Sequence, residues 1–183
     1  GVWQPGDVIQ AAIGQSDNAF TPLQLATYCA TIANNGTRLK THLVKQVTNY
    51  NRDQVISETE PEVVSQVDIS QENLKIVQEA MKGVTQSGGT ANSIFGDYGI
   101  TIAAKTGTAE NPGHSDNVTF IAYAPYDDPE IAVAVVLEYG SRGTYSMNVA
   151  KDIFDAYFYG KTVDENGNLV MPEETNSSAA TNE

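Results

Sequence analysis

Four consecutive residues near the middle of the chain suit the binding of an extended anionic ligand: Lys105, Thr106, Gly107 and Thr108. The lysine supplies a positive charge that can anchor a carboxylate or lower the pKa of a neighbouring hydroxyl or amine. The threonines add hydroxyl donors, the glycine leaves room beside the strand, and a backbone N–H here could face an oxyanion. Many hairpins also end in this string, and the tripeptide alone favours that interpretation, with the lysine reaching solvent.

No serine of the chain fits as a nucleophile for this motif. A lysine three residues after a serine would share its helical face and could take the serine proton, but no serine has one. Ser16 and Ser115 are each followed by Asp-Asn, and Ser70 by Gln-Glu-Asn-Leu-Lys. We assign all three to loops or helix caps. His42 and His114 lack Cys or carboxylate neighbours at ligand spacing, so no metal is predicted.

Three helices are expected around the motif. A threonine cap followed by proline predicts a helix over about residues 22–34, where Asn-Asn-Gly ends it. Ser70 caps a second helix, whose apolar residues recur at helical spacing before a Ser-Gly-Gly stop. The third helix covers "SMNVAKDIFDAYFYG" and ends at Gly160.

Three β-branched runs predict strands over residues 100–105, 118–124 and 131–138. The last two are joined by a short turn and should pair antiparallel. The third strand is apolar on both faces, so helices should cover both, the last helix among them. The expected fold class is therefore α/β, of the α+β type, with an antiparallel sheet flanked by helices.

Composition excludes several kinds of partner. With 10 basic against 23 acidic residues the formal net charge is -13, which would repel nucleic acid and anionic lipid. The single cysteine, Cys29, rules out an internal disulfide framework and suits a helix in the core. No apolar run approaches the ~20 residues of a membrane helix, so we expect this segment to make no membrane contact.

The two ends differ from the middle. The start, "GVWQPGDVIQAAIG", opens without a regular element and suggests a piece of a longer protein. Residues 161–183 are polar and acidic, which predicts a flexible tail after a domain over residues 1–160.

Several blocks resemble one enzyme family. "IGQSDNAFTPLQLATYCATIANNGT", "AAKTGTAE" and "FIAYAPYDDPEIAVAVVLE" occur in the order found in class B penicillin-binding proteins. The resemblance covers residues 1–160 and is to the C-terminal portion of the transpeptidase domain, of the elongation type. It implies a penicillin-binding, serine β-lactamase-like fold that is present only in part.

The resemblance implies a role for each motif residue in a serine D,D-transpeptidase. Lys105 would be catalytic and would polarise the substrate. Thr106 and Thr108 would contact the terminal carboxylate of a D-Ala-D-Ala stem peptide, and Gly107 would leave space for it. The backbone N–H of Thr108 would form half of the oxyanion hole.

Further expectations follow from the same resemblance. β-Lactams would bind the same cleft, and no cofactor would be needed. A missing N-terminal part of the same protein would supply Ser-x-x-Lys and Ser-x-Asn, so the isolated chain would be inactive. The parent would work at the outer face of the bacterial cytoplasmic membrane, with its anchor upstream.

Two other functions stay open. One is a non-catalytic β-lactam sensor or a pseudo-enzyme that binds peptidoglycan. The other is a related hydrolase, a D,D-carboxypeptidase or β-lactamase, which rapid turnover of β-lactam would indicate. The Thr-Pro-x-Gln helix and its Gly-Gln lead-in favour the transpeptidase, by resemblance alone.

Overall fold

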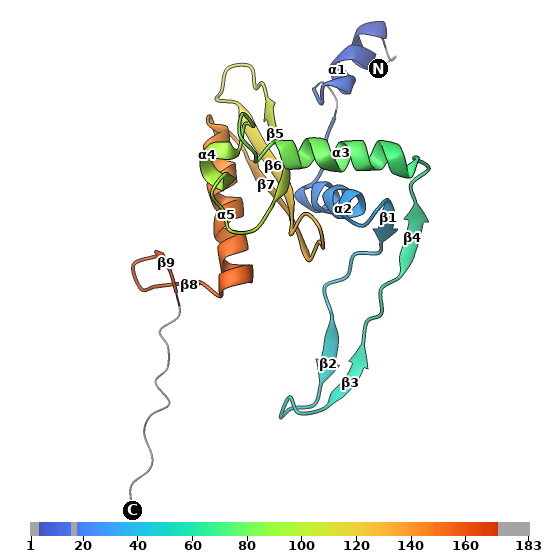
Figure 1. Ribbon diagram of the computed structural model, residues 1–183, viewed down its shortest axis with the longest axis vertical. Coiled ribbons are helices and arrows are strands. Elements are labelled where there is room, and N and C mark those ends of the chain that lie inside the picture. The colour runs from blue at the N-terminus through green and yellow to red at the C-terminus, as the bar shows by residue number, and fades with distance from the viewer. Residues whose placement is uncertain (1–3, 16–17, 172–183) are drawn as a thin grey trace, which may run out of the picture.

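The computed structural model describes residues 4–15 and 18–171 of the chain. At its centre is a three-stranded antiparallel sheet with the strand order β5-β6-β7 (Figure 1). The strands are β5 (Ala103–Ala109), β6 (Asn117–Ala124) and β7 (Ile131–Leu137). Strands β6 and β7 pair as predicted, and the mixed helix and antiparallel sheet architecture confirms the expected fold class.

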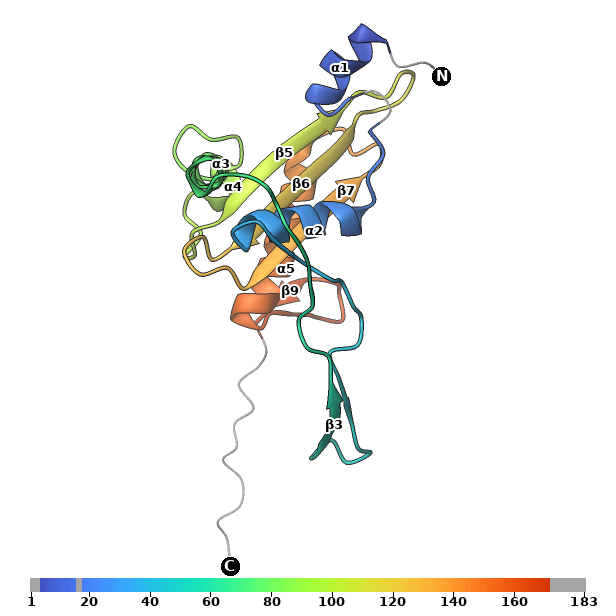
Figure 2. The ribbon, with the colours of Figure 1, turned by 90° about the vertical axis from the view of Figure 1, so that its right-hand side faces the viewer.

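Helices cover both faces of the sheet (Figure 2). On one face lie α2 (Pro22–Ala33) and α3 (Gln71–Gly83), and on the other lie α4 (Asn92–Phe95) and α5 (Gly143–Tyr159). The α5 face encloses the aromatic core, which includes Phe95, Phe120 and Phe154. The α2 face encloses a second core, which includes Cys29, Leu74, Met81, Ile121 and Tyr123. Strand β7 is therefore covered on both faces, as its composition predicted.

Local capping residues mark the starts of α2 and α3 and the end of α5. The Thr21 hydroxyl accepts the N–H of Gln24 at 3.2 Å, and the Gln24 side chain accepts the N–H of Thr21 at 2.8 Å. The Ser70 hydroxyl accepts the N–H of Asn73 at 3.2 Å at the start of α3. Helix α5 ends at Gly160, whose φ of 66° is left-handed. These three capping residues were predicted from the sequence, but α3 ends at Gly83, before the predicted Ser-Gly-Gly stop.

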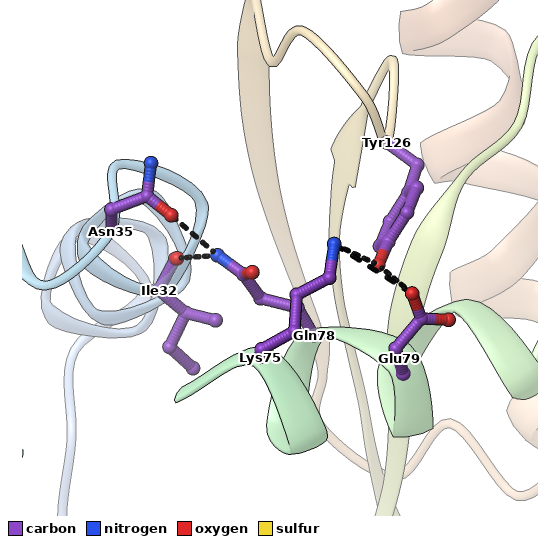
Figure 3. Close-up of polar contacts among 6 residues, drawn as sticks. All are labelled: Ile32, Asn35, Lys75, Gln78, Glu79 and Tyr126. Carbon is purple, nitrogen blue, oxygen red and sulfur yellow. Dashed lines mark hydrogen bonds and ion pairs between the residues drawn. The ribbon is translucent and has the colours of Figure 1, made fainter. Parts of the chain in front are cut away.

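Polar side chains fasten α3 to its neighbours (Figure 3). The Gln78 amide donates to the Ile32 carbonyl at the end of α2 at 2.8 Å. The Tyr126 hydroxyl, in the turn after β6, donates to Glu79 at 2.7 Å, and Lys75 donates to that hydroxyl at 3.3 Å. These hydrogen bonds fix the position of α3 relative to α2 and to the turn after β6.

A buried carboxylate fixes the end of α5. Asp155 is 3% exposed and accepts hydrogen bonds at 2.8 Å from Lys151, Lys161 and Tyr98. Burial alone would raise the pKa of Asp155, but these hydrogen bonds outweigh it and lower the pKa. The cluster ties the loop before β5 to the last helix, because Tyr98 lies in that loop.

A projecting arm joins α2 to α3, and the sequence did not predict it (Figure 1). It consists of two antiparallel pairs, β1 with β4 and β2 with β3. The strands are β1 (Thr37–Leu39), β2 (Gln46–Thr48), β3 (Val55–Glu58) and β4 (Val63–Gln66).

The two ends also depart from expectation. The start contains α1 (Pro5–Ala12), where no regular element was predicted; the Asp7 side chain accepts the N–H of Gln4 at 2.7 Å. The segment assigned to the tail contains a short hairpin of β8 (Thr162–Val163) and β9 (Leu169–Val170). Ser16 and the tail beyond residue 171 lie outside the described residues. Within residues 4–15 and 18–171, no helix is long and apolar enough to cross a bilayer.

Candidate functional site

The Lys-Thr-Gly-Thr motif lies inside β5, whereas the sequence predicted that a strand over residues 100–105 would end at it. The strand begins three residues later than predicted and continues to Ala109. The reason is its partner: β6 pairs with every motif residue, from Lys105 opposite Ile121 to Thr108 opposite Val118. The motif is therefore held in extended conformation along its whole length, which a hairpin end would not do.

Strand alternation divides the motif between the two faces of the sheet. Ala103 packs in the α2-side core and Ala104 in the α5-side core. Because side chains alternate, Lys105 and Gly107 belong to the α2 side, and Thr106 and Thr108 to the α5 side. The strand is fully buried at Ala103 and Ala104, and Lys105 and Thr108 are exposed. Its first residues anchor the strand in the core, and the motif follows where the strand reaches the surface.

Lys105 presents its charge at this surface. Its ammonium nitrogen donates to the carbonyl oxygen of Thr106 at 2.5 Å. Among the residues that the structure describes, no carboxylate forms an ion pair with Lys105. A lysine in this state can accept an anionic ligand without first breaking an internal salt bridge.

Neither the backbone conformation nor the packing of the fold requires a glycine at position 107. Its φ is not in the left-handed region, and a Cβ built on it would meet the Cβ of Thr119 at 3.5 Å, an ordinary van der Waals contact. Gly140, in the loop after β7, contrasts with it, because a Cβ there would lie 2.5 Å from Val118. The fold thus requires a small residue at 140 but leaves position 107 free, as expected where another molecule approaches the strand.

Strand β5 lies at one edge of the sheet. Within the described part of the chain it pairs with β6 alone, so half of its backbone N–H and C=O groups point away from the sheet. Two hollows of about 550 and 540 Å³ flank α2, and no motif residue lines either. The motif therefore forms an exposed wall, suited to an extended peptide that pairs along the strand edge.

The other residues considered from the sequence lie apart from this wall or serve the fold. Ser70 caps α3, as predicted. Ser115 is exposed in the loop between β5 and β6, where the His114 ring lies 5.0 Å from that of Tyr139. His42 is exposed in the arm, near the carbonyl of Lys40. Cys29 is fully buried, and burial raises the pKa of its thiol to about 12.

One residue beside the motif was not identified from the sequence. The Thr90 hydroxyl, in the loop between α3 and α4, lies 3.3 Å from the hydroxyl of Thr106. From the sequence, the residues just before it were interpreted only as the Ser-Gly-Gly stop of a helix. The Ser-Gly-Gly that precedes Thr90 marks a tight turn, but it does not indicate which residues the turn contacts.

Comparison with known proteins gives a consistent result. The family model described as "Penicillin binding protein transpeptidase domain" matches residues 2–158. Penicillin-binding protein 2A of Bacillus subtilis is 37% identical over 172 residues, which cover 84% of this chain and 24% of that protein. Peptidoglycan D,D-transpeptidase MrdA of Haemophilus influenzae is 30% identical over 175 residues, covering 85% of this chain and 26% of that protein.

Solved structures give the same relationship. The imipenem acyl-enzyme complex of penicillin-binding protein A from M. tuberculosis matches with a TM-score of 0.69 and 31% identity. The match covers 81% of this chain and 33% of that chain. The chain spans about a quarter of the length of the curated relatives it matches. It thus corresponds to part of a domain in those proteins.

Proposed function

The chain belongs to the penicillin-binding protein transpeptidase family, and we propose that it forms the Lys-Thr-Gly wall of a D,D-transpeptidase cleft that cross-links peptidoglycan stem peptides. One observation carries this proposal. Lys105, Thr106, Gly107 and Thr108 stand on an edge strand. The lysine has no ion pair with any described residue, and the fold itself does not need the glycine. A lysine reaching solvent from a hairpin end would require neither feature.

Each motif residue has a role that its position supports. The extended donor peptide lies along the free edge of β5, over Gly107, where no side chain obstructs it. Lys105 places a positive charge beside the reacting centre, and the hydroxyls of Thr106 and Thr108 donate to the terminal carboxylate. The backbone N–H of Thr108 provides one donor of the oxyanion hole during acyl transfer.

The nucleophile belongs to the rest of the protein. No serine in the sequence has a lysine three residues on, so the serine that takes up the acyl group comes from outside this chain. Attack on the D-Ala-D-Ala bond releases D-Ala, and an acceptor amine then takes the acyl group from the serine. β-Lactams bind at the same wall. The whole protein works at the outer face of the bacterial cytoplasmic membrane and is anchored upstream of this segment.

Labelling with a fluorescent penicillin tests the proposal. The full-length protein should carry the label through denaturation, whereas the isolated 183-residue chain should not. Release of D-Ala from a donor peptide by the full-length protein would identify the transpeptidase or carboxypeptidase reaction, and transfer to an acceptor amine would separate the two. A stable label on the isolated chain would contradict the assignment of the nucleophile. Rapid hydrolysis of the penicillin would indicate a β-lactamase.

A further inference from the structure

The loop between α3 and α4 brings a third hydroxyl to the motif. Thr90 Oγ1 lies 3.3 Å from Thr106 Oγ1, within hydrogen-bonding distance, and either oxygen can be the donor. Thr90 is exposed, and Thr106 is half-buried. Thr106 and Thr108 share the α5-side face of β5, so Thr90 adds to a group of hydroxyls on that face.

The loop holds Thr90 rigidly. On one side of Thr90, Gly89 packs so closely on the end of α3 that a Cβ would lie 2.2 Å from the Val84 carbonyl oxygen. On the other side, the Ala91 N–H donates to the same carbonyl at 2.9 Å. The Asn92 side chain donates to the carbonyl of Thr85 at 3.2 Å. With both neighbours fixed, Thr90 has little freedom to leave Thr106.

A buried hydroxyl connects this loop support to β5. Thr85 is 1% exposed, and its hydroxyl donates to the Ile102 carbonyl at 2.7 Å. Ile102 immediately precedes the first residue of β5. The end of α3, the loop and the strand are therefore joined at both Thr85 and Thr90. Such support is typical of groups that must be held in place before a ligand arrives.

Counting hydrogens decides the direction of the contact when ligand is bound. Each threonine hydroxyl has one hydrogen to donate, and a carboxylate can only accept. If Thr106 donated to Thr90, it would have no hydrogen left for the carboxylate. The reverse direction leaves the Thr106 hydrogen free, and a negative charge at the end of the chain of hydroxyls strengthens both hydrogen bonds.

We propose that Thr90 is a positioning residue for carboxylate recognition. Its hydroxyl donates to Thr106 Oγ1 and so directs the Thr106 hydrogen to the terminal carboxylate of the donor peptide or to the carboxylate of a β-lactam. Thr90 acts through Thr106 and does not itself contact the reacting atoms. This inference rests on the proposed function and adds a residue outside the Lys-Thr-Gly-Thr motif to the recognition of the carboxylate.

Penicillin acylation of the full-length protein tests the proposal through Thr90→Val and Thr90→Ser. Valine keeps the shape of threonine but lacks the hydroxyl, whereas serine keeps the hydroxyl. Resolving the kinetics gives the dissociation constant of the initial complex and the acylation rate constant. Thr90→Val should raise the dissociation constant about 3- to 10-fold, as for the loss of one hydrogen bond, and leave the rate constant little changed. Thr90→Ser should restore wild-type binding.

Three controls separate this role from a structural one. In competition with penicillin, a donor peptide ending in carboxylate should bind Thr90→Val more weakly, but its C-terminal amide should bind wild type and variant alike. The double variant Thr90→Val with Thr106→Val should bind no more weakly than Thr106→Val alone, because the two hydroxyls act in series. Thermal unfolding should occur at the same temperature in all these proteins.

Each contrary result has a definite meaning. Wild-type binding by Thr90→Val, failure of serine to rescue, or equal losses for the carboxylate and the amide would each overturn the role of Thr90. If the wild-type protein itself took up no penicillin, the proposed function would fail and this inference with it. That result needs no variant, so the two failures can be told apart.

Discussion

Replacing Gly107 with alanine should impair ligand binding in the proposed cleft without destabilising the fold. The added Cβ would meet Thr119 Cβ at 3.5 Å and the Thr119 carbonyl oxygen at 3.9 Å, both ordinary contacts. Loss of glycine also reduces the entropy of the unfolded chain, so stability should be unchanged or rise by up to ~1 kcal/mol. A ligand seated over this position would instead be overpacked by ~1–3 kcal/mol, which corresponds to about a 5- to 150-fold loss in penicillin acylation efficiency.

The matched control is Gly140→Ala. There the Cβ would lie 2.5 Å from Val118 and 2.9 Å from Leu137, so the fold itself must shift, at a cost of ~1–3 kcal/mol. Thermal unfolding and the second-order rate of labelling by fluorescent penicillin should be measured for both variants of the full-length protein. Gly107→Ala should melt like wild type and label slowly, whereas Gly140→Ala should melt earlier. Wild-type labelling of Gly107→Ala, or destabilisation equal to that of Gly140→Ala, would refute the reasoning.

Three further predictions concern the core. Phe154→Ala should lower the free energy of unfolding by ~3–5 kcal/mol in urea titrations, because Phe154 is fully buried between aromatic rings. Asp155→Asn should be less stable than wild type at pH 7, and the difference in stability should shrink as the pH falls below about 4. Because the pKa of Asp155 is lowered in the fold, its carboxylate stabilises the fold at pH values above the ordinary pKa of an aspartate, and protonation at lower pH removes that contribution. Unchanged stability of Asp155→Asn at pH 7 would contradict this. The Cys29 thiol should resist an aromatic disulfide reagent in the native protein at pH 8 and react once urea unfolds it, because burial raises its pKa to about 12; fast native reaction would show that α2 opens.

Elements with local signals could be predicted from the sequence. The two hydrogen bonds between Thr21 and Gln24 link residues three apart, so the start of α2 depends on its own sequence. The same holds for Ser70 at the start of α3 and for Gly160 at the end of α5. The apolar composition of β7 indicated burial on both faces, and its residues do pack into both cores, one on each face of the sheet.

Elements that depend on distant partners could not be predicted in this way. Strand β1 pairs with β4, joining Thr37 to Gln66, and the four strands of the arm are short and exposed on most positions. Such short strands show too little apolar alternation to be recognised from their own residues. For β5, the β-branched residues Ile100 and Ile102 placed the predicted start too early. Its true limits are set by pairing with β6, which the sequence of β5 does not contain.

The candidate site shows the same division. The resemblance picked out Lys105 to Thr108 as consecutive residues, so no long-range contact was needed to find them. Thr90 is sixteen residues from Thr106 and reaches it only because a glycine turn packs on the end of α3. A threonine in a glycine-rich connection has no local signal of such a contact.

The position of the motif within β5 explains how a strand edge can serve as a binding wall. Electrostatic stabilisation of a transition state requires donors whose geometry is fixed before the reaction. Ala103 and Ala104 fix the start of β5 between two cores, β6 pairs with it as far as Ala109, and Thr85 holds the residue before it. The exposed or half-buried residues from Lys105 to Thr108 are therefore held rigidly without being fully buried. A motif at the end of a hairpin would be equally accessible but would lack this support, and for that reason the continuation of β5 through the motif favours a binding role over a turn.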